Sequence, residues 1–217
     1  LVLCGSVSVS AQCLHLLCES GIPVVHLSMG NWFYGITSGI GLRNAYDRAA
    51  QFSAAADDGR RLALARAFIQ AKVQNQRTLL RRNAAGEVDE ALDRMRNLFP
   101  HLDDCGDVDA LMGVEGAIAA LYFANWGAML ATGELRDAFA PESRNRRPPK
   151  DPVNAMLSFG YALLAKETSI ALLAEGLDPH WGFLHSPRHG RPALALDLME
   201  EFRPLVVDSA VLSAINN

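Results

Sequence analysis

The sequence predicts a mainly α-helical protein in which a helical domain follows the tail of a small β-rich domain. Loose alternation of apolar residues and β-branched valines mark the first part of the chain, whereas apolar residues at helical spacing continue from about residue 42 almost to the end. We therefore assign 1–40 to the end of the β-rich domain and a linker, and 41–217 to the helical domain.

The first 40 residues predict a strand, a short helix and a second strand. Residues 1–10 have strand character, 11–20 have a helical pattern that ends at Gly21, and 24–28 form an apolar run. Glycines then crowd the stretch GNWFYGITSGIG, which predicts that strand geometry ends there and a linker begins.

The remainder predicts six to eight helices. Polar breaks separate them at 57–59, 83–86, 100–106 and 133–150. Asp151 and Pro152 form a helix start, because Asp is a good N-cap and Pro suits the first helical position. Gly176 is expected to end that helix, and Pro192 to begin another.

Composition excludes several classes of protein. Of the 217 residues, 50% are hydrophobic, which excludes a disordered or fibrous chain. The four cysteines lack CxxC spacing, so we expect reduced thiols and a cytoplasmic protein rather than a zinc or disulfide framework. Charged or amide residues interrupt every apolar run, so no membrane span is expected. The chain begins at Leu1 without Met, and we expect it to be a piece of a longer polypeptide.

A single acidic residue, Glu115, lies in a segment that is otherwise apolar or small from Leu111 to Phe123. Ionising a carboxylate on such a helix costs several kcal/mol unless a positive group meets it. We therefore expect a partner for Glu115, either an arginine or a divalent cation. Sequence spacing alone leaves both open.

A second group of candidates lies in HSPRHGRPALALDLMEEFRP, which leads from His185 into a helix carrying Asp197 and Glu200. These two acids are three residues apart and share a helix face. Acids near a helix start can merely favour its positive dipole end. Together with Glu115, however, His185 and Glu200 make up the oxygen and nitrogen donor set that suits manganese or magnesium.

Basic residues concentrate between positions 57 and 82, where seven arginines and lysines face two aspartates, a net charge of +5 in a chain of net charge -4. A solvated helix face explains many such runs, but this imbalance favours a polyanion. A second basic cluster precedes Asp151 and could close over phosphates. The residues expected to contact DNA are Arg60, Arg61, Arg66, Lys72, Arg77, Arg81, Arg146, Arg147 and Arg188.

Four motifs occur in succession: GVEG at 113–116, RPPKDPVNAMLSFGYALL at 147–164, GLDPHWGFLH at 176–185 and RPALALDLMEEFRP at 191–204. In this order they resemble the CRISPR-associated integrase/endonuclease family of spacer acquisition, from about Gly5 to Asp208. The resemblance implies that Glu115, His185 and Glu200 are the metal ligands and that Asp197 is an auxiliary catalytic acid.

The resemblance further implies a mainly α catalytic domain with most of the family's N-terminal β-domain lying before Leu1. It implies a Mn²⁺ or Mg²⁺ cofactor, double-stranded DNA (spacer precursor and repeat) as substrate, a homodimer, and a dimer of a small CRISPR adaptation protein as partner. The implied reaction inserts spacer DNA into a CRISPR array by attack of a 3′-hydroxyl on a phosphodiester, with stabilisation of charge by the cation.

Two alternatives remain open at this stage. The basic segment 57–82 suits a non-catalytic helical DNA-binding or scaffold subunit, and the donor set could serve a metal-dependent hydrolase of small phosphate esters. The integrase hypothesis requires that Glu115 and Glu200 lie close together, a condition that a structure can test.

Overall fold

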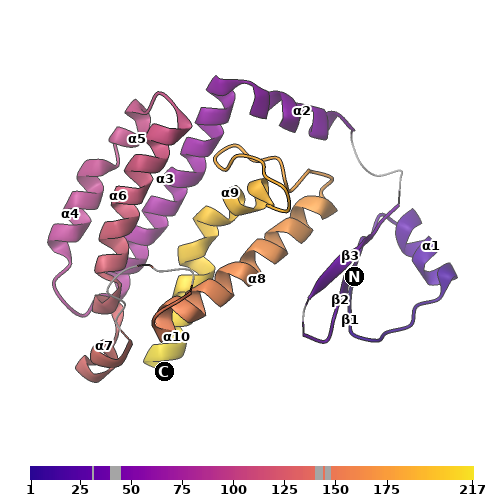
Figure 1. The fold of residues 1–217 in the computed structure, drawn as a ribbon. Helices are drawn as coiled ribbons and strands as arrows, with labels where there is room; N and C mark the ends of the chain where they lie inside the picture. The colour runs from indigo at the N-terminus through magenta and orange to yellow at the C-terminus, as the bar shows by residue number, and fades with distance from the viewer. Residues whose placement is uncertain (31, 40–44, 140–143, 145–147) are drawn as a thin grey trace.

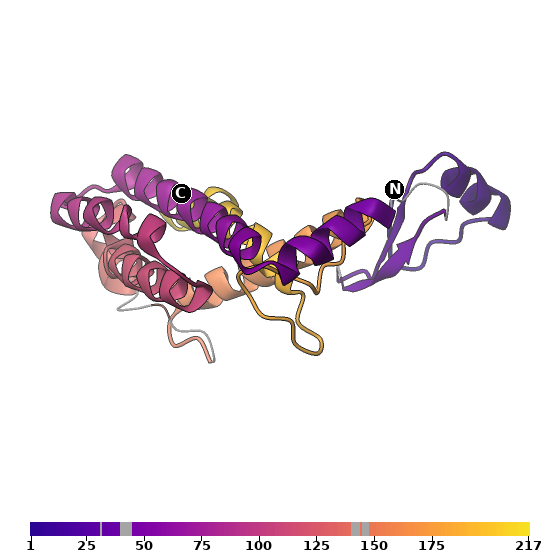
Figure 2. The ribbon, with the colours of Figure 1, turned by 90° about the horizontal axis from the view of Figure 1, so that it is seen from above.

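A computed structural model of the chain describes residues 1–30, 32–39, 45–139, 144 and 148–217. The helices that follow residue 44 form one body, and a small sheet with one short helix lies beyond the end of this body (Figure 1). Seen from above, the sheet continues the long direction of the molecule past helix α2 (Figure 2). The predicted fold class, mainly helical with a small β part at the N-terminus, is confirmed.

The sheet has three strands in the order β1-β2-β3, namely β1 (Val2–Cys4), β2 (Val24–Leu27) and β3 (Phe33–Thr37). Helix α1 (Ala11–Glu19) connects β1 to the parallel strand β2, and β3 runs antiparallel to β2. Strand β3 corrects the expectation that strand geometry ends in the glycine-rich stretch. Its aromatic and β-branched residues pair with β2 despite Gly35, because strand formation depends on such pairing more than on intrinsic propensity.

The helical body contains nine α-helices within the described residues, one more than the upper end of the expected range. They are α2 (Ala45–Ala56), α3 (Asp58–Asn83), α4 (Asp89–Leu98), α5 (His101–Asp104), α6 (Val108–Ala124), α7 (Gly133–Phe139), α8 (Pro152–Ala174), α9 (Ala193–Phe202) and α10 (Ser209–Asn216). A 3₁₀ turn, η1 (Trp126–Met129), and a π-helical turn, η2 (Arg203–Asp208), complete the body. The short helices α5 and α7 lie inside segments that the sequence predicted as breaks.

Aspartates begin three of the long helices. Asp57, Asp107 and Asp151 each accept a hydrogen bond from a backbone N–H in the first turn of α3, α6 and α8. Gly176 follows α8 with a φ of 84°. Glycine adopts this left-handed conformation readily because it has no Cβ atom. These findings confirm the predicted start and end of α8, and α9 begins directly after Pro192 as predicted.

Helix α9 packs between α3 and α8, and α3 also packs against α6. Large apolar side chains such as Ile69, Leu80, Tyr122, Trp126 and Met199 are buried where these helices meet. The packing brings the middle of α3, the middle of α6 and the end of α9 together, although they are far apart in the sequence (Figure 1).

Among the described helices, α8 is the one whose length and apolar composition would suit a membrane span. Core helices of globular proteins have the same character, and α8 packs on α9 and η2 while burying Asn154, Leu157 and Tyr161. The predicted domain boundary at 40/41 falls in 40–44, outside the described residues, and stays a prediction.

Candidate active site

Glu115 and Glu200 both form ion pairs with the same ammonium group, that of Lys72. The Nζ atom of Lys72, on α3, lies 2.5 Å from Oε1 of Glu115, on α6, and 2.7 Å from Oε2 of Glu200, on α9. The lysine and Glu200 side chains are nearly inaccessible, and Glu115 is 20% exposed. Among the described side chains, the partner of Glu115 is therefore a lysine that also binds Glu200, and not the expected arginine. A divalent cation at Glu115 stays a prediction.

A second cation binds the other oxygen of Glu200. Arg203 Nη2 lies 3.0 Å from Glu200 Oε1, and its guanidinium group stacks 4.6 Å from the ring centre of Tyr161. Burial alone would raise the pKa of Glu200, but the charges of Lys72, Arg203 and His185 outweigh it and lower the pKa to about 2. Glu200 is therefore an ionised carboxylate throughout the neutral range.

The turn that holds Arg203 has a local cause. Pro204 has no backbone N–H, so the α-helical hydrogen bonding of α9 cannot continue through it, and residues Arg203–Asp208 form a π-helical turn instead. This widened turn carries Arg203 at its start and Asp208 at its end.

Asp197 fixes the loop that bears His185. Its Oδ2 accepts backbone N–H bonds from Phe183 (2.6 Å) and Leu184 (2.9 Å), and its Oδ1 accepts the backbone N–H of His185 (2.9 Å) and lies 2.6 Å from Nδ1 of the same residue. Asp197 is fully buried. It orients the imidazole through Nδ1 and leaves Nε2 as the ring nitrogen without a described hydrogen bond. The expected role of Asp197 as an auxiliary catalytic acid stays a prediction.

A buried carboxylate that the sequence did not single out lies next to this site. Asp208 accepts hydrogen bonds from the hydroxyl groups of Tyr122 (2.9 Å) and Tyr161 (2.5 Å). Burial raises the pKa of Asp208 to about 6, although the two hydroxyl groups and the charge of Arg203 oppose this effect. The two tyrosines on apolar helices were a usable signal, because a buried hydroxyl needs a partner.

Two of the residues predicted to contact DNA also make hydrogen bonds within the protein, and their contact with DNA stays a prediction. Arg61 donates to the backbone carbonyl of Phe183 (2.8 Å), and Arg66 donates to the carbonyls of Leu102 (2.8 Å) and Cys105 (2.9 Å). Lys72 requires a correction, since the structure places it in the buried site and not on a solvated helix face. Spacing on α3 alone could not distinguish a side chain facing α6 and α9 from one facing solvent.

The rest of the predicted DNA-contact set lies elsewhere. Arg60, Arg81 and Arg188 are exposed, and Arg77 is half-buried. Arg146 and Arg147 lie outside the described residues. Contact of any of these arginines with DNA stays a prediction.

The predicted metal ligands have suitable chemistry but are not arranged as a preformed site. Within the described part of the chain, no group of three or more His, Cys, Asp and Glu side chains lies at metal-ligand spacing. Two features nevertheless fit a cation. Glu200 Oε2 is buried, and although Lys72 pairs with it, no described donor meets it with hydrogen-bond geometry. The contact of His185 Nδ1 with a carboxylate is also the arrangement that orients metal-binding histidines.

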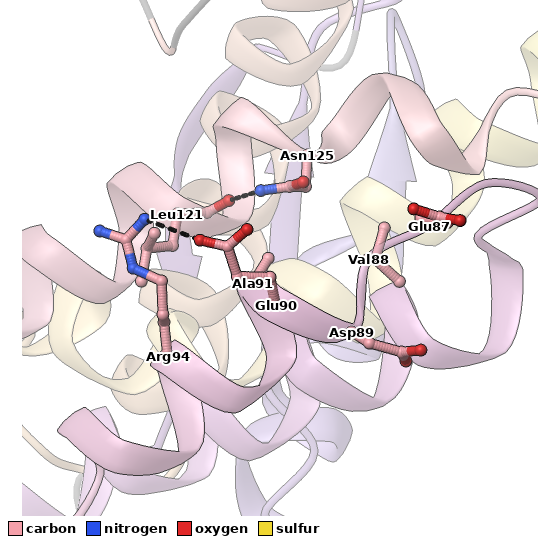
Figure 3. A pocket seen from close by; sticks show the side chains of 8 residues that line it. All are labelled: Glu87, Val88, Asp89, Glu90, Ala91, Arg94, Leu121 and Asn125. Atoms are coloured by element: carbon pink, nitrogen blue, oxygen red, sulfur yellow. Dashed lines mark hydrogen bonds and ion pairs between the residues drawn. The ribbon is translucent and has the colours of Figure 1, made fainter.

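A hollow of about 420 Å³ lies away from these residues, between the start of α4 and the end of α6 (Figure 3). Its lining includes Glu87, Asp89 and Glu90, and Arg94 pairs with Glu90 at 4.0 Å. None of the predicted site residues lines it. Its acidic lining disfavours contact with a phosphate backbone. The candidate site is the cluster of Lys72, Glu115 and Glu200, because there the structure brings two of the predicted ligands together.

Comparison with known proteins identifies relatives along the whole chain. Residues 1–217 match the family model described as CRISPR associated protein Cas1. A "CRISPR-associated exonuclease Cas4/endonuclease Cas1 fusion" of Geobacter sulfurreducens is 48% identical over 220 residues, which cover 98% of this chain and 39% of that protein.

Two solved structures are also similar. A partial Cas6-RT-Cas1–Cas2 complex matches with a TM-score of 0.82 and 27% identity, over 99% of this chain and 64% of that one. A casposase bound to an integration product matches with a TM-score of 0.74 and 27% identity, over 99% of this chain and 62% of that one. The chain thus spans less than two thirds of each of these relatives.

Proposed function

The chain belongs to the Cas1 family of CRISPR-associated proteins, and on this basis we propose that it carries the catalytic centre of a metal-dependent DNA integrase/endonuclease. The proposed reaction inserts spacer DNA into a CRISPR array, with a 3′-hydroxyl attacking a phosphodiester bond. The proposed ligands of a Mn²⁺ or Mg²⁺ ion are Glu115, His185 and Glu200.

The observation that carries this proposal is the convergence of Glu115 and Glu200 on one cation. The two residues are far apart in the sequence and come from different helices, yet both bind the same ammonium group. Two carboxylates that lie this close together in a largely buried site can also bind a divalent cation, and such cations commonly bind substrate phosphates as well. A divalent ion bound there would stabilise charge on the phosphorus and lower the pKa of the attacking hydroxyl.

The surrounding residues prepare the site. Asp197 holds the His185 loop by three backbone hydrogen bonds and fixes the imidazole through Nδ1, so that Nε2 can serve as a ligand or accept a proton. Lys72 and Arg203 keep Glu200 ionised. Glu200 is therefore ionised, and His185 is held in place, before substrate arrives, which reduces the reorganisation that the reaction requires.

Two solved relatives support the choice of substrate and partners. One is a complex that contains Cas2, and the other is bound to an integration product. We propose that this protein likewise acts on double-stranded DNA in the cytoplasm, as a homodimer together with a dimer of a small adaptation partner of the Cas2 kind. The exposed Arg60, Arg81 and Arg188 are proposed contacts for phosphates.

The test is strand transfer of a labelled spacer duplex into a repeat-containing plasmid by the complete polypeptide, with its partner and Mn²⁺. Glu115→Gln, His185→Ala and Glu200→Gln should each lower the rate about a hundredfold or more, as expected when metal coordination is disturbed. Glu167→Gln is the matched control, because this glutamate is 62% exposed on α8 and should leave the rate unchanged.

DNA binding measured on the same variants separates the alternatives. Retained, salt-sensitive binding by all variants, with no strand transfer by the wild type, would favour the scaffold subunit. Turnover of a small phosphate ester that is insensitive to competing DNA would favour a hydrolase. Equal strand transfer by wild type and the three site variants would refute the proposed catalytic centre.

A further inference from the structure

Lys72 differs from the other predicted DNA-contact residues in what surrounds it. Its side chain is 8% exposed, and its ammonium group contacts two carboxylates that come from two other helices. Arg61 and Arg66, on the same helix, bind backbone carbonyl groups instead. The position of Lys72 is thus built around two acidic groups that our proposed function assigns to a metal ion.

The positive and negative side chains in direct contact in the candidate site already balance in charge. Lys72 and Arg203 contribute two positive charges, and Glu115 and Glu200 contribute two negative ones. Adding a divalent cation without any other change would leave an excess of two positive charges in a place largely closed to water. Burying uncompensated charge is strongly unfavourable, so a positive group must leave or a negative one must arrive when a divalent cation binds.

The two positive groups differ in how readily they can move. Arg203 binds Glu200 and also stacks on the ring of Tyr161, which holds its guanidinium group from a second side. Among the described contacts Lys72 has no such stacking partner, and it binds the carboxylates through the ammonium group at the end of a flexible four-carbon chain. Lys72 is therefore the group that can withdraw from both carboxylates.

We propose that Lys72 is an internal competitor of the divalent cation: it holds Glu115 and Glu200 together when no metal is bound, and metal binding displaces its ammonium group. This inference rests on the proposed function, since it takes these carboxylates as metal ligands. It adds a role for a residue outside the ligand set, and it predicts that metal affinity in the absence of DNA is limited by Lys72.

The test is equilibrium binding of Mn²⁺ to the complete protein without DNA, measured by titration calorimetry. Lys72→Met removes the competing charge without adding a ligand, and it should bind Mn²⁺ about tenfold more tightly than the wild type, which corresponds to about 1.4 kcal/mol. Lys72→Arg keeps the charge and should bind weakly. Lys166→Met is the matched control, because Lys166 pairs with an exposed glutamate on α8 and should leave the affinity unchanged.

Thermal unfolding supplies a second measurement. Metal-free Lys72→Met should unfold at a lower temperature than the wild type, and Mn²⁺ should raise its midpoint by a larger amount. Should the variant fold only when Mn²⁺ is added, this rescue supports the proposal, whereas failure to fold at any Mn²⁺ concentration contradicts it.

Glu200→Gln separates this inference from the proposed function. Weakened Mn²⁺ binding by Glu200→Gln, combined with unchanged affinity in Lys72→Met, would refute competition by Lys72 and leave the proposed metal ligands standing. Unchanged Mn²⁺ binding by Glu200→Gln would place the metal elsewhere and refute both.

Discussion

Glu200 and Asp208 are two buried carboxylates, eight residues apart on the continuous segment formed by α9 and η2, yet their acidities move in opposite directions. The pKa of Glu200 is lowered to about 2, whereas that of Asp208 is raised to about 6. Their exposed fractions, 5% and 1%, are both so small that burial cannot explain the difference.

The difference lies in the partners. Glu200 binds a lysine and an arginine, whose charges more than offset its loss of hydration. Asp208 binds two tyrosine hydroxyl groups, which donate hydrogen bonds but carry no charge, and Arg203 acts on it without a direct ion pair among the described contacts. Hydrogen bonds alone therefore keep Asp208 in place without keeping it fully ionised at mildly acidic pH.

The largest expected effect comes from removing the cation that distinguishes Glu200. Lys72→Met leaves two largely buried carboxylates without their shared partner, and it should lower the free energy of unfolding by about 3 kcal/mol or more at neutral pH without metal. Urea unfolding in the presence of a chelator measures this change. Arg96→Met removes an ion pair with Asp93 in which both side chains are exposed, so it should cost less than about 1 kcal/mol. Equal losses in the two variants would contradict the role assigned to Lys72.

A comparable effect, seen as a pH dependence, is expected for Asp208. Its folded pKa of about 6 lies above the ordinary 3.8, so the folded state holds a proton that the unfolded state releases, and stability falls as pH rises from about 4 to about 6. The difference between the two pKa values corresponds to roughly 3 kcal/mol. Asp208→Asn keeps an oxygen that accepts a hydrogen bond but cannot ionise, so its stability should lack this decline.

Glu200→Gln provides the opposite case. The folded pKa of Glu200, about 2, lies below its ordinary 4.5, so the carboxylate contributes stability above pH 4.5 that is lost as pH falls towards 2. The variant should lack this loss between pH 4.5 and 3 while retaining the decline between pH 4 and 6. Urea unfolding across this pH range measures both, and an identical pH profile for the two variants would show that the contrast is wrong.

Part of the candidate site can be predicted from the sequence. An acid on an apolar helix and a histidine before an acidic helix are sequence patterns, and they single out Glu115, His185, Asp197 and Glu200. The structure brings Glu115 together with Glu200, and His185 together with Asp197. Lys72 was recognised only as one of several basic residues. Its contacts join helices α3, α6 and α9, and sequence spacing gives the face of a helix but not the helix that it meets.

Fold prediction had the same limit. The start of α8 at Asp151 and its end at Gly176 follow from local chemistry, and both were correct. Strand β3 was missed because its residues form a strand by pairing with β2, and η2 was missed because the effect of Pro204 depends on how α9 continues past it. Local signals identify caps, whereas partners far along the chain determine pairing and turns of this kind.

The smallest effect we expect comes from one hydrogen bond in the Asp208 cluster. Tyr161→Phe keeps the ring that stacks under Arg203 but removes the hydroxyl that donates to Asp208, which should cost about 1 kcal/mol of unfolding free energy at pH 7. Because this hydroxyl lowers the pKa of Asp208, its loss should also move the decline in stability to higher pH. Tyr34→Phe, on an exposed tyrosine of β3, is the control and should change neither quantity.

The decline in stability could instead occur over the same pH range in Tyr161→Phe as in the wild type. The hydroxyl group of Tyr161 would then not determine the pKa of Asp208, and the comparison with Glu200 would have to rest on charge alone.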